Sequence, residues 1–312
     1  MLSHDLAKRF VALMLYTRGV DQTAVRLYKR GILSLWPSCV GQEAAQVGSV
    51  LACGSDTYIF PSYRDHAAAL ARGITPPQLL SQWAGTTFCG WTPSEVNFHC
   101  YNLVVAAQLL HAVGFAMGLS IKNSDQVVMT YFGDGATSQG DFAEALNLAA
   151  VRNAPVLFFC QNNGWAISTS VDLQMKNSIA DRAKGFGVNS VRVDGNNIEE
   201  VYRITSKAIA QVRSGNGPFL IEAVTMRMAG HTTADTPALY RNELEMREWS
   251  DKDPIDGAIE LLETYNWHQD GWLQQLRKEI DTYCQELMTL RFADPDVRCS
   301  IPPPATISEL LT

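Results

Sequence analysis

Two short polar segments of the chain have the composition of a site for a metal ion and a phosphate. The segments 133–136 (Gly-Asp-Gly-Ala) and 161–165 (Gln-Asn-Asn-Gly-Trp) each follow a β-rich apolar run. Because ligands of open α/β sheets bind at the carboxyl ends of the strands, these residues are the first candidates for chemistry. Asp134 and Asn163 would offer a carboxylate and an amide oxygen, which are the hard ligands that Mg²⁺ prefers. The glycines beside Asp134 would let backbone amides approach a phosphate closely.

The same residues also permit less specific interpretations. Gly-Asp-Gly and Asn-Asn-Gly are both common in turns, so either motif alone is more often structural than functional. The glycines at 133, 135 and 140 give the spacing GxGxxxxG instead of the GxGxxG of dinucleotide-binding folds, and no P-loop sequence occurs. The presence of both motifs after consecutive strands of one βαβ unit is what favours a functional site.

The elements that must position these residues alternate between strand and helix. Apolar runs and helical periods in the middle of the chain predict strands at 127–132, 155–160, 190–193 and 219–225, and helices at 141–152 and 198–214. This alternation predicts an α/β fold with a doubly wound, mainly parallel sheet that is flanked by helices.

Further helices are predicted in the sequence before and after the segments of this sheet. Their ranges are 5–30, 41–52, 64–72, 76–84, 256–265 and 270–290, with a short strand at 57–61 and an extended tail at 301–304. We predict one domain over residues 1–312, with a helical region at 1–125, the sheet core at about 126–230, and C-terminal helices and tail at about 250–312.

Charge and composition exclude several classes of function. A net charge of −7 and a pI near 5.4, without a basic stripe, argue against binding of nucleic acid or of an anionic membrane surface. The sequence has no run of about 18 apolar residues, so no transmembrane helix is predicted. The apolar stretch 10–16 is too short for a signal peptide. Seven scattered cysteines without a CxxC pair favour a reduced, cytoplasmic protein.

The region from Gly133 to Ser170 resembles the thiamine diphosphate motif, as it stands in the alpha subunit of the decarboxylating component of 2-oxo acid dehydrogenase complexes. Further segments follow in the order of that family: GQEAA at 41–45, YRD at 63–65, VVAAQ at 104–108, RVDGN at 192–196, GHTTAD at 230–235 with YR at 240–241, Trp249, and DP at 253–254. The resemblance covers residues 10 to about 260.

The resemblance implies a role for each matching residue. Asp134, Asn163 and the backbone carbonyl of Trp165 would ligate Mg²⁺, and the diphosphate of thiamine diphosphate would complete the shell. The groups that would hold the diphosphate are the side chains of Tyr63 and Arg64 and the backbone amides of Gly135 and Ala136. Those that would contact the aminopyrimidine ring or the reactive centre are Leu103, Val105 and the catalytic residue His231.

The resemblance also implies partners. In this class a glutamate of a second, pyrimidine-binding module contacts the aminopyrimidine, and the present chain has only one recognisable half of such a site. We therefore expect a beta subunit, an alpha2-beta2 heterotetramer with active sites at the alpha–beta interfaces, a 2-oxo acid substrate, and a lipoyl-bearing transacylase as acyl acceptor.

Two other functions remain open from the sequence. The segment Thr86–Pro93 contains no histidine, although members that act in complexes typically have one there. This departure favours a split thiamine-dependent carboligase or decarboxylase that forms acyloins or cleaves acetoin outside a lipoyl complex. A non-catalytic scaffold is disfavoured, because Arg64, Asp134, Asn163 and His231 are all present. The aromatic residues Phe60, Phe88, Trp91 and Phe98 either line the substrate pocket or belong to the core.

Overall fold

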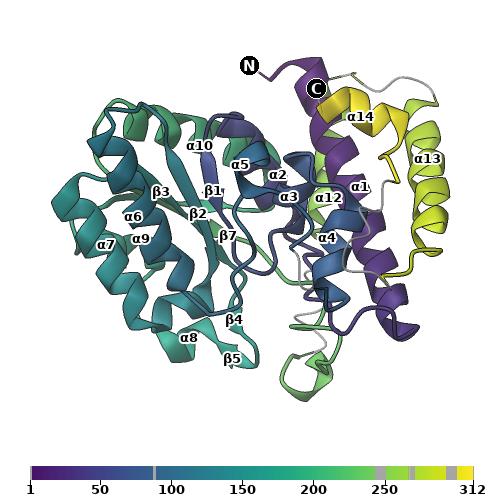
Figure 1. Cartoon of the computed structure of the whole chain (residues 1–312), viewed down its shortest axis with the longest axis horizontal. Helices are drawn as coiled ribbons and strands as arrows, with labels where there is room; N and C mark the ends of the chain where they lie inside the picture. Colours follow the sequence, from purple (N-terminus) through teal and green to yellow (C-terminus); the bar gives the residue numbers. More distant parts are fainter. Residues whose placement is uncertain are drawn as a thin grey trace.

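A five-stranded parallel sheet forms the centre of the molecule (Figure 1). The computed structural model describes residues 2–86, 89–242, 251–265, 267, 271–292 and 301–311. The strand order is β1 (Tyr58–Phe60), β2 (Val128–Gly133), β3 (Val156–Asn162), β7 (Phe219–Val224) and β6 (Asn189–Asp194), and every neighbouring pair is parallel. The predicted α/β class with a mainly parallel sheet is therefore confirmed.

The remaining elements of the described residues surround this sheet. They are α1 (His4–Lys29), α2 (Glu43–Ala52), α3 (His66–Ala71), α4 (Pro76–Trp83), α5 (Pro93–Val96), α6 (Ala107–Ile121), η1 (Asp134–Ser138), α7 (Gly140–Arg152), β4 (Trp165–Ala166), β5 (Thr169–Ser170), α8 (Val171–Gln174), α9 (Ile179–Lys184), α10 (Ile198–Arg213), η2 (Pro237–Leu239), α12 (Pro254–Thr264), α13 (Trp272–Leu287) and α14 (Ala305–Leu311).

Alternation along the central strands divides the core into two layers. In β2, Met129 and Tyr131 pack on one face of the sheet, while Val128 and Phe132 pack on the other. The first face is covered by α2 and α10 and then by α1, α12 and α13, and the second by α6, α7 and α9 (Figure 1). Both faces of β2 and β3 are thus buried, as their nearly continuous apolar sequences predict.

The N-terminal region departs from its prediction in two ways. The region contains the predicted short strand at 57–61 as β1, but β1 pairs with β2, so the sheet begins upstream of the range 126–230. It also contains α6, which the helical periodicity does not single out. The sequence of α6 (AQLLHAVGFAMGLSI) is apolar around almost its whole circumference and therefore lacks the polar face that marks a surface helix.

The C-terminal elements follow the prediction more closely. Helices α12 and α13 occupy the expected ranges, and the tail is extended at 301–304, where the hydroxyl of Tyr283 donates to the carbonyl of Ile301 (3.3 Å). It then forms α14, which was not predicted. Among the described helices, none has the length and apolar character needed to cross a membrane.

Candidate cofactor-binding site

A cavity of about 410 Å³ lies at the carboxyl edge of the sheet. The loops after four adjacent strands, β1, β2, β3 and β7, all contribute to its wall, because parallel strands end at the same edge. All ten residues predicted for the site line this one cavity: Tyr63, Arg64, Leu103, Val105, Asp134, Gly135, Ala136, Asn163, Trp165 and His231. Their roles in binding stay predictions.

Asp134 leaves one acceptor without a partner at this edge. The side chain is 1% exposed, and Oδ2 accepts a hydrogen bond from Nε2 of Gln174 (3.2 Å). Oδ1 is buried and has no hydrogen-bond partner among the described residues. Burial raises the pKa of the Asp134 carboxyl, because the ionised form is less stable away from water. A buried carboxylate oxygen without a donor fits a cation ligand.

Asn163 presents its amide in a defined orientation beside Asp134. Its Nδ2 donates to Oε1 of Gln42 (2.9 Å), and its Oδ1 accepts from the backbone N–H of Trp165 (3.2 Å). A carbonyl oxygen has two lone pairs, so one remains for a cation. No group of three or more His, Cys, Asp or Glu side chains suited to a metal occurs in the described parts of the chain, so a cation here would have one charged protein ligand.

Gly135 is required by a close approach of two segments. A Cβ atom at this position would lie 2.8 Å from Cβ of Ala166, which belongs to β4. The absence of a side chain therefore lets η1 pack directly against the strand that carries Trp165. This packing places the backbone of residues 134–136 in the cavity wall, where a phosphate could approach it.

Two buried guanidinium groups bring positive charge to the wall of the cavity. Arg64 is 6% exposed and Arg227 is fully buried, and in the described residues neither has a carboxylate within 4 Å. Burial, together with the nearby charges of Arg64 and Arg241, lowers the pKa of Arg227 to about 10, so it remains charged at neutral pH. Two buried cations without an ion-pair partner indicate a site for an anion.

His231 lies between these two arginines. Its Nδ1 atom is 3.2 Å from Nη2 of Arg64 and 2.9 Å from Nη1 of Arg227. Because an arginine can only donate, Nδ1 must accept and the imidazole must carry its proton on Nε2. Burial and the two positive charges lower the pKa of His231 to about 4, so the ring is neutral at physiological pH. The backbone N–H of His231 donates to Asp235 (2.6 Å), which holds the loop in place.

Aromatic and apolar side chains complete the cavity. The ring of Tyr63 lies 5.5 Å from the guanidinium carbon of Arg64 and 6.0 Å from the ring of His231. Leu103 and Val105 are 59% and 43% exposed, so the mouth of the cavity is apolar and open.

The aromatic residues considered for a substrate pocket lie elsewhere. Phe60, Trp91 and Phe98 belong to the hydrophobic core and do not line this cavity, whereas Phe88 lies outside the described residues. The apolar residues that line it instead include Leu35, Trp83 and Ile167.

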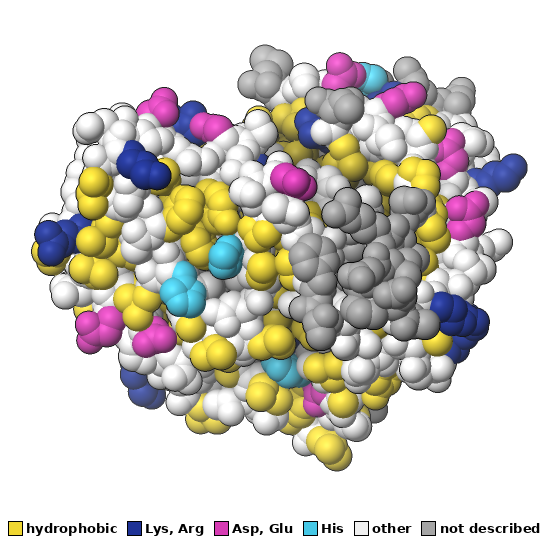
Figure 2. All heavy atoms as spheres, viewed as in Figure 1, with side chains coloured by type: hydrophobic (Ala, Val, Ile, Leu, Met, Phe, Trp, Pro, Cys, Tyr) yellow, Lys and Arg dark blue, Asp and Glu magenta, His cyan; other side chains and the backbone are white. Residues whose placement is uncertain are grey.

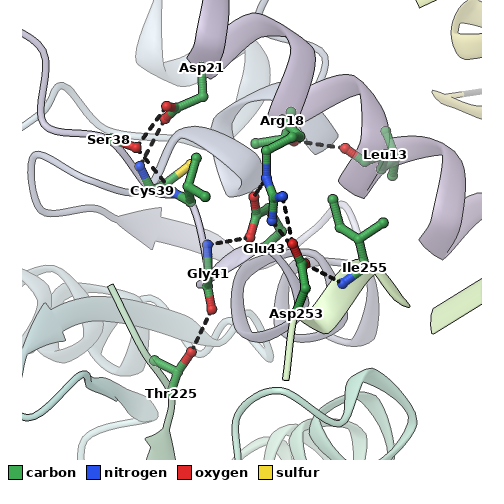
Figure 3. A network of polar contacts seen from close by, with 12 residues as sticks. Leu13, Arg18, Asp21, Ser38, Cys39, Gly41, Glu43, Thr225, Asp253 and Ile255 are labelled. Carbon is green, nitrogen blue, oxygen red and sulfur yellow. Dashed lines mark hydrogen bonds and ion pairs between the residues drawn. The ribbon is translucent and has the colours of Figure 1, made fainter. Parts of the chain in front are cut away.

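A polar network fixes the loop that leads into α2 (Figure 3). Arg18 donates to Glu43 (2.6 Å) and forms a bidentate pair with Asp253 (2.8 and 3.0 Å). Glu43 in turn accepts from the backbone N–H of Gly41 (2.7 Å), whose carbonyl accepts from Thr225 (2.9 Å). Gly41 has φ +94°, and a Cβ atom there would lie 2.6 Å from the carbonyl oxygen of Met226, so only glycine fits.

Several polar residues of the cavity were missed from the sequence, among them Gln42, Gln161 and Arg227. Gln42 lies in the recognised GQEAA segment, and Gln161 directly precedes the two asparagines. Arg227 follows the end of β7 by three residues, so the rule that ligands bind at carboxyl ends of strands, applied to this strand too, would have found it.

The chain is a member of a family of thiamine diphosphate-dependent enzymes. The chain belongs to the dehydrogenase E1 component family, whose model matches residues 11–296. It is 40% identical over 300 residues to 3-methyl-2-oxobutanoate dehydrogenase subunit alpha of Mycobacterium tuberculosis, covering 95% of this chain and 81% of that relative. It is 34% identical over 297 residues to pyruvate dehydrogenase E1 component subunit alpha of Bacillus cereus, covering 95% and 79%. The resemblance recognised in the sequence is therefore confirmed.

Proposed function

We propose that this chain is the alpha subunit of a 2-oxo acid dehydrogenase component, which uses thiamine diphosphate and Mg²⁺ to decarboxylate a 2-oxo acid and passes the acyl group to lipoyllysine on a transacylase. One observation carries the proposal. A single cavity combines a carboxylate oxygen without a donor, at Asp134, with two buried guanidiniums without a carboxylate, at Arg64 and Arg227. A Mg²⁺ diphosphate would satisfy both, because its cation and its anion are joined.

The residues of this chain would hold the two ends of the cofactor differently. Asp134, Asn163 and the carbonyl of Trp165 would bind Mg²⁺. The diphosphate would lie against the cationic and backbone donors of the cavity, namely Arg64, Arg227, Gly135 and Ala136, beside Tyr63. Leu103 and Val105 would contact the aminopyrimidine ring at the apolar mouth. When bound, thiamine diphosphate supplies an electron sink for the pair of electrons that is released as CO₂ leaves a 2-oxo acid.

His231 would hold a proton at a defined atom. The two arginines occupy its Nδ1, so Nε2–H is the group that remains for substrate. A neutral imidazole in this tautomer can donate a hydrogen bond or a proton to an oxygen from Nε2. Its fixed orientation supports the proposed catalytic role.

A beta subunit would complete the site. Asp134 is the only carboxylate among the described residues that line the cavity, and no glutamate lies there. The glutamate that this cofactor class needs would therefore come from the partner. The exposed segment Leu103–Val105 offers an apolar contact surface at the mouth. In the view of Figure 2, hydrophobic side chains gather over the half of the molecule in which α6 lies. We propose an alpha2-beta2 heterotetramer with the active sites at these alpha–beta contacts.

The substrate would be a 2-oxo acid of the kinds for which the relatives are named, 3-methyl-2-oxobutanoate or pyruvate. The six described cysteines are all free thiols, which suits work in the cytoplasm.

Calorimetric titration tests the proposed site. Thiamine diphosphate with Mg²⁺ is titrated into the chain alone and into the chain mixed with its beta partner, and decarboxylation of both substrates is then followed with an artificial electron acceptor. We expect tight binding that depends on Mg²⁺ and turnover in the mixture only. Full turnover by the chain alone would refute the shared site, and the absence of binding in both samples would refute the cofactor assignment.

A split carboligase is the second candidate, favoured by the absence of histidine from Thr86 to Pro93. The two functions differ in the acceptor of the acyl group. Acyl transfer to an isolated lipoyl domain supports the dehydrogenase, whereas acyloin formation with an aldehyde and no reaction with the lipoyl domain supports the carboligase.

A further inference from the structure

Three buried side chains and the half-buried Asn163 form a continuous series of hydrogen bonds that runs along the wall of the cavity. Nε2 of Gln161 donates to Oδ1 of Asp65 (2.5 Å), and Oε1 of Gln161 accepts from Nε2 of Gln42 (2.8 Å). Oε1 of Gln42 then accepts from Nδ2 of Asn163 (2.9 Å). Asp65, Gln161 and Gln42 are at most 2% exposed, so water does not compete for these groups. We call these four hydrogen-bonded side chains, Asp65, Gln161, Gln42 and Asn163, the amide relay.

Backbone groups fix the direction of the amide relay at its inner end. Gln46 also donates from Nε2 to Oε1 of Gln161 (2.8 Å). The orientation of Gln46 is unambiguous, because its Oε1 accepts from the backbone N–H of Ala67 (2.9 Å) and its Nε2 donates to the carbonyl of Arg64 (3.1 Å). Gln161 must therefore turn its oxygen toward Gln46 and its nitrogen toward Asp65.

Each amide then determines the next one. Because Gln161 presents an oxygen, Gln42 must present its nitrogen to it and its own oxygen to Asn163. Asn163 must in turn present Nδ2 to Gln42, which leaves Oδ1 on the other side. The backbone N–H of Trp165, which can only donate, lies against that Oδ1 (3.2 Å) and so gives the same orientation independently.

We infer that Gln42 is a positioning residue, which holds the carboxamide of Asn163 with its oxygen toward the metal site and its nitrogen away from it. This inference rests on the proposed Mg²⁺ site. The orientation matters because a half-turn of a carboxamide exchanges a lone-pair donor for an NH₂ group, which cannot ligate a cation. Partners that orient the ligands of a metal typically change its affinity by about 10–100-fold.

The loop that carries Gln42 is itself held on both sides. Gly41 is bound through its N–H to Glu43 and through its carbonyl to Thr225, and its conformation excludes any side chain (Figure 3). Gln42 is thus placed by a rigid backbone, which a residue that orients a ligand within a fraction of an ångström requires.

A double-mutant cycle separates orientation from packing. The proteins are the parent, Gln42→Met, Asn163→Asp and the double variant, each as full chain purified with its beta partner and saturated with thiamine diphosphate. The probe is Mn²⁺, an octahedral oxygen-preferring cation, and its dissociation constant is measured by the electron paramagnetic resonance of free Mn²⁺. Gln108→Met is the matched control, because Gln108 is another buried glutamine of the same cavity but donates to the carbonyl of Tyr131.

We expect Gln42→Met to raise the dissociation constant of Mn²⁺ by about 10–100-fold with Asn163 present, and Gln108→Met to change it by less than about twofold. With aspartate at position 163, Gln42→Met should cause no loss, because both atoms of a carboxylate are oxygens and either orientation supplies a ligand.

Three results would count against the relay. If Gln42→Met lowers the affinity for Mn²⁺ equally in the parent and in Asn163→Asp, Gln42 only supports packing. If it does not lower the affinity in the parent, Asn163 needs no orienting partner. Failure of the parent to bind Mn²⁺ would refute the proposed metal site itself, which is a distinguishable outcome. Thermal unfolding is recorded for every variant, and Gln42→Ala replaces Gln42→Met in the same cycle if the methionine variant does not fold.

Discussion

Arg227 donates a hydrogen bond from Nη1 to Nδ1 of His231 over 2.9 Å, and this contact determines where the imidazole carries its proton. With Nδ1 occupied, the only polar group that His231 can offer to the cavity is Nε2–H. Replacing His231 by alanine should lower turnover by about 10²-fold, the scale of one positioned acid–base group, while cofactor binding stays detectable. Steady-state rates and calorimetry measure the two effects.

His231→Gln provides the control for this prediction. The glutamine amide can place an N–H donor near the position of Nε2, so it should keep part of the activity that alanine loses if hydrogen-bond donation is the main role. Equal rates for the alanine variant and the parent would assign His231 a structural role instead.

The lowered pKa of His231 also predicts how stability depends on pH. The folded-state pKa is about 4, whereas an unfolded histidine has a pKa near 6.5. Between these values the unfolded chain binds a proton that the native state does not bind, so stability falls as pH drops from about 6.5 to about 4. His231→Gln should make this fall less steep. Urea unfolding at pH 7.5, 6 and 5 gives the free energy of unfolding at each pH. An equal fall of this free energy with pH in variant and parent would contradict the assignment.

Asp134 predicts a conflict between stability and function. In the protein without cofactor, its buried carboxylate has an oxygen that no donor satisfies among the described residues. Asp134→Asn removes the buried charge and should therefore stabilise this state by about 1 kcal/mol while abolishing Mg²⁺-dependent cofactor binding. Asp172→Asn, at an exposed position, should change neither property. A less stable Asp134→Asn protein would mean that the carboxylate is satisfied without a cation.

The two glycines of the Gly-Asp-Gly motif should respond differently to alanine. A Cβ atom at Gly135 would lie 2.8 Å from Cβ of Ala166, whereas one at Gly133 meets nothing closer than the carbonyl oxygen of Gln161 at 3.9 Å. Gly135→Ala should thus destabilise the cofactor-free protein by about 1–3 kcal/mol through overpacking, and Gly133→Ala by clearly less. Thermal unfolding of both variants compares them directly, and equal losses would refute the steric argument.

The sequence predicts the central sheet better than the helices that cover it. The apolar runs of β2 and β3 predict strands that are buried on both faces, and they also give the positions of Asp134 and Asn163. Helix α6 was missed because a periodic signal needs a polar face, which this sequence lacks.

The parts of the site that depend on tertiary contacts were not predictable in the same way. Gln42 and Gln161 are 119 residues apart in sequence, and only the folded chain brings their amides to 2.8 Å. Arg227 resembles an ordinary surface arginine in the sequence, and its full burial without a carboxylate becomes apparent only in the structure. Motifs identify the atoms that contact a ligand, whereas the groups that orient those atoms are determined by packing.

The ion-pair network that fixes the loop before α2 gives the last prediction. Arg18 is the only cation paired with Glu43 among the described ion pairs, and the Glu43 side chain is fully buried. Arg18→Met should therefore cost about 3–5 kcal/mol, because it leaves a buried carboxylate without its counter-charge. Urea unfolding measures this loss.

A second substitution, Glu43→Gln, should recover most of the stability lost in Arg18→Met. The glutamine removes the uncompensated charge but can still accept the hydrogen bond from the backbone N–H of Gly41, which fixes the loop that carries Gln42. Because Glu43 holds Gly41, Arg18→Met should also lower the affinity for Mn²⁺, and the double variant should regain this affinity together with stability. Recovery of stability without recovery of metal affinity would show that Arg18 contributes to the site in some way other than through Gly41.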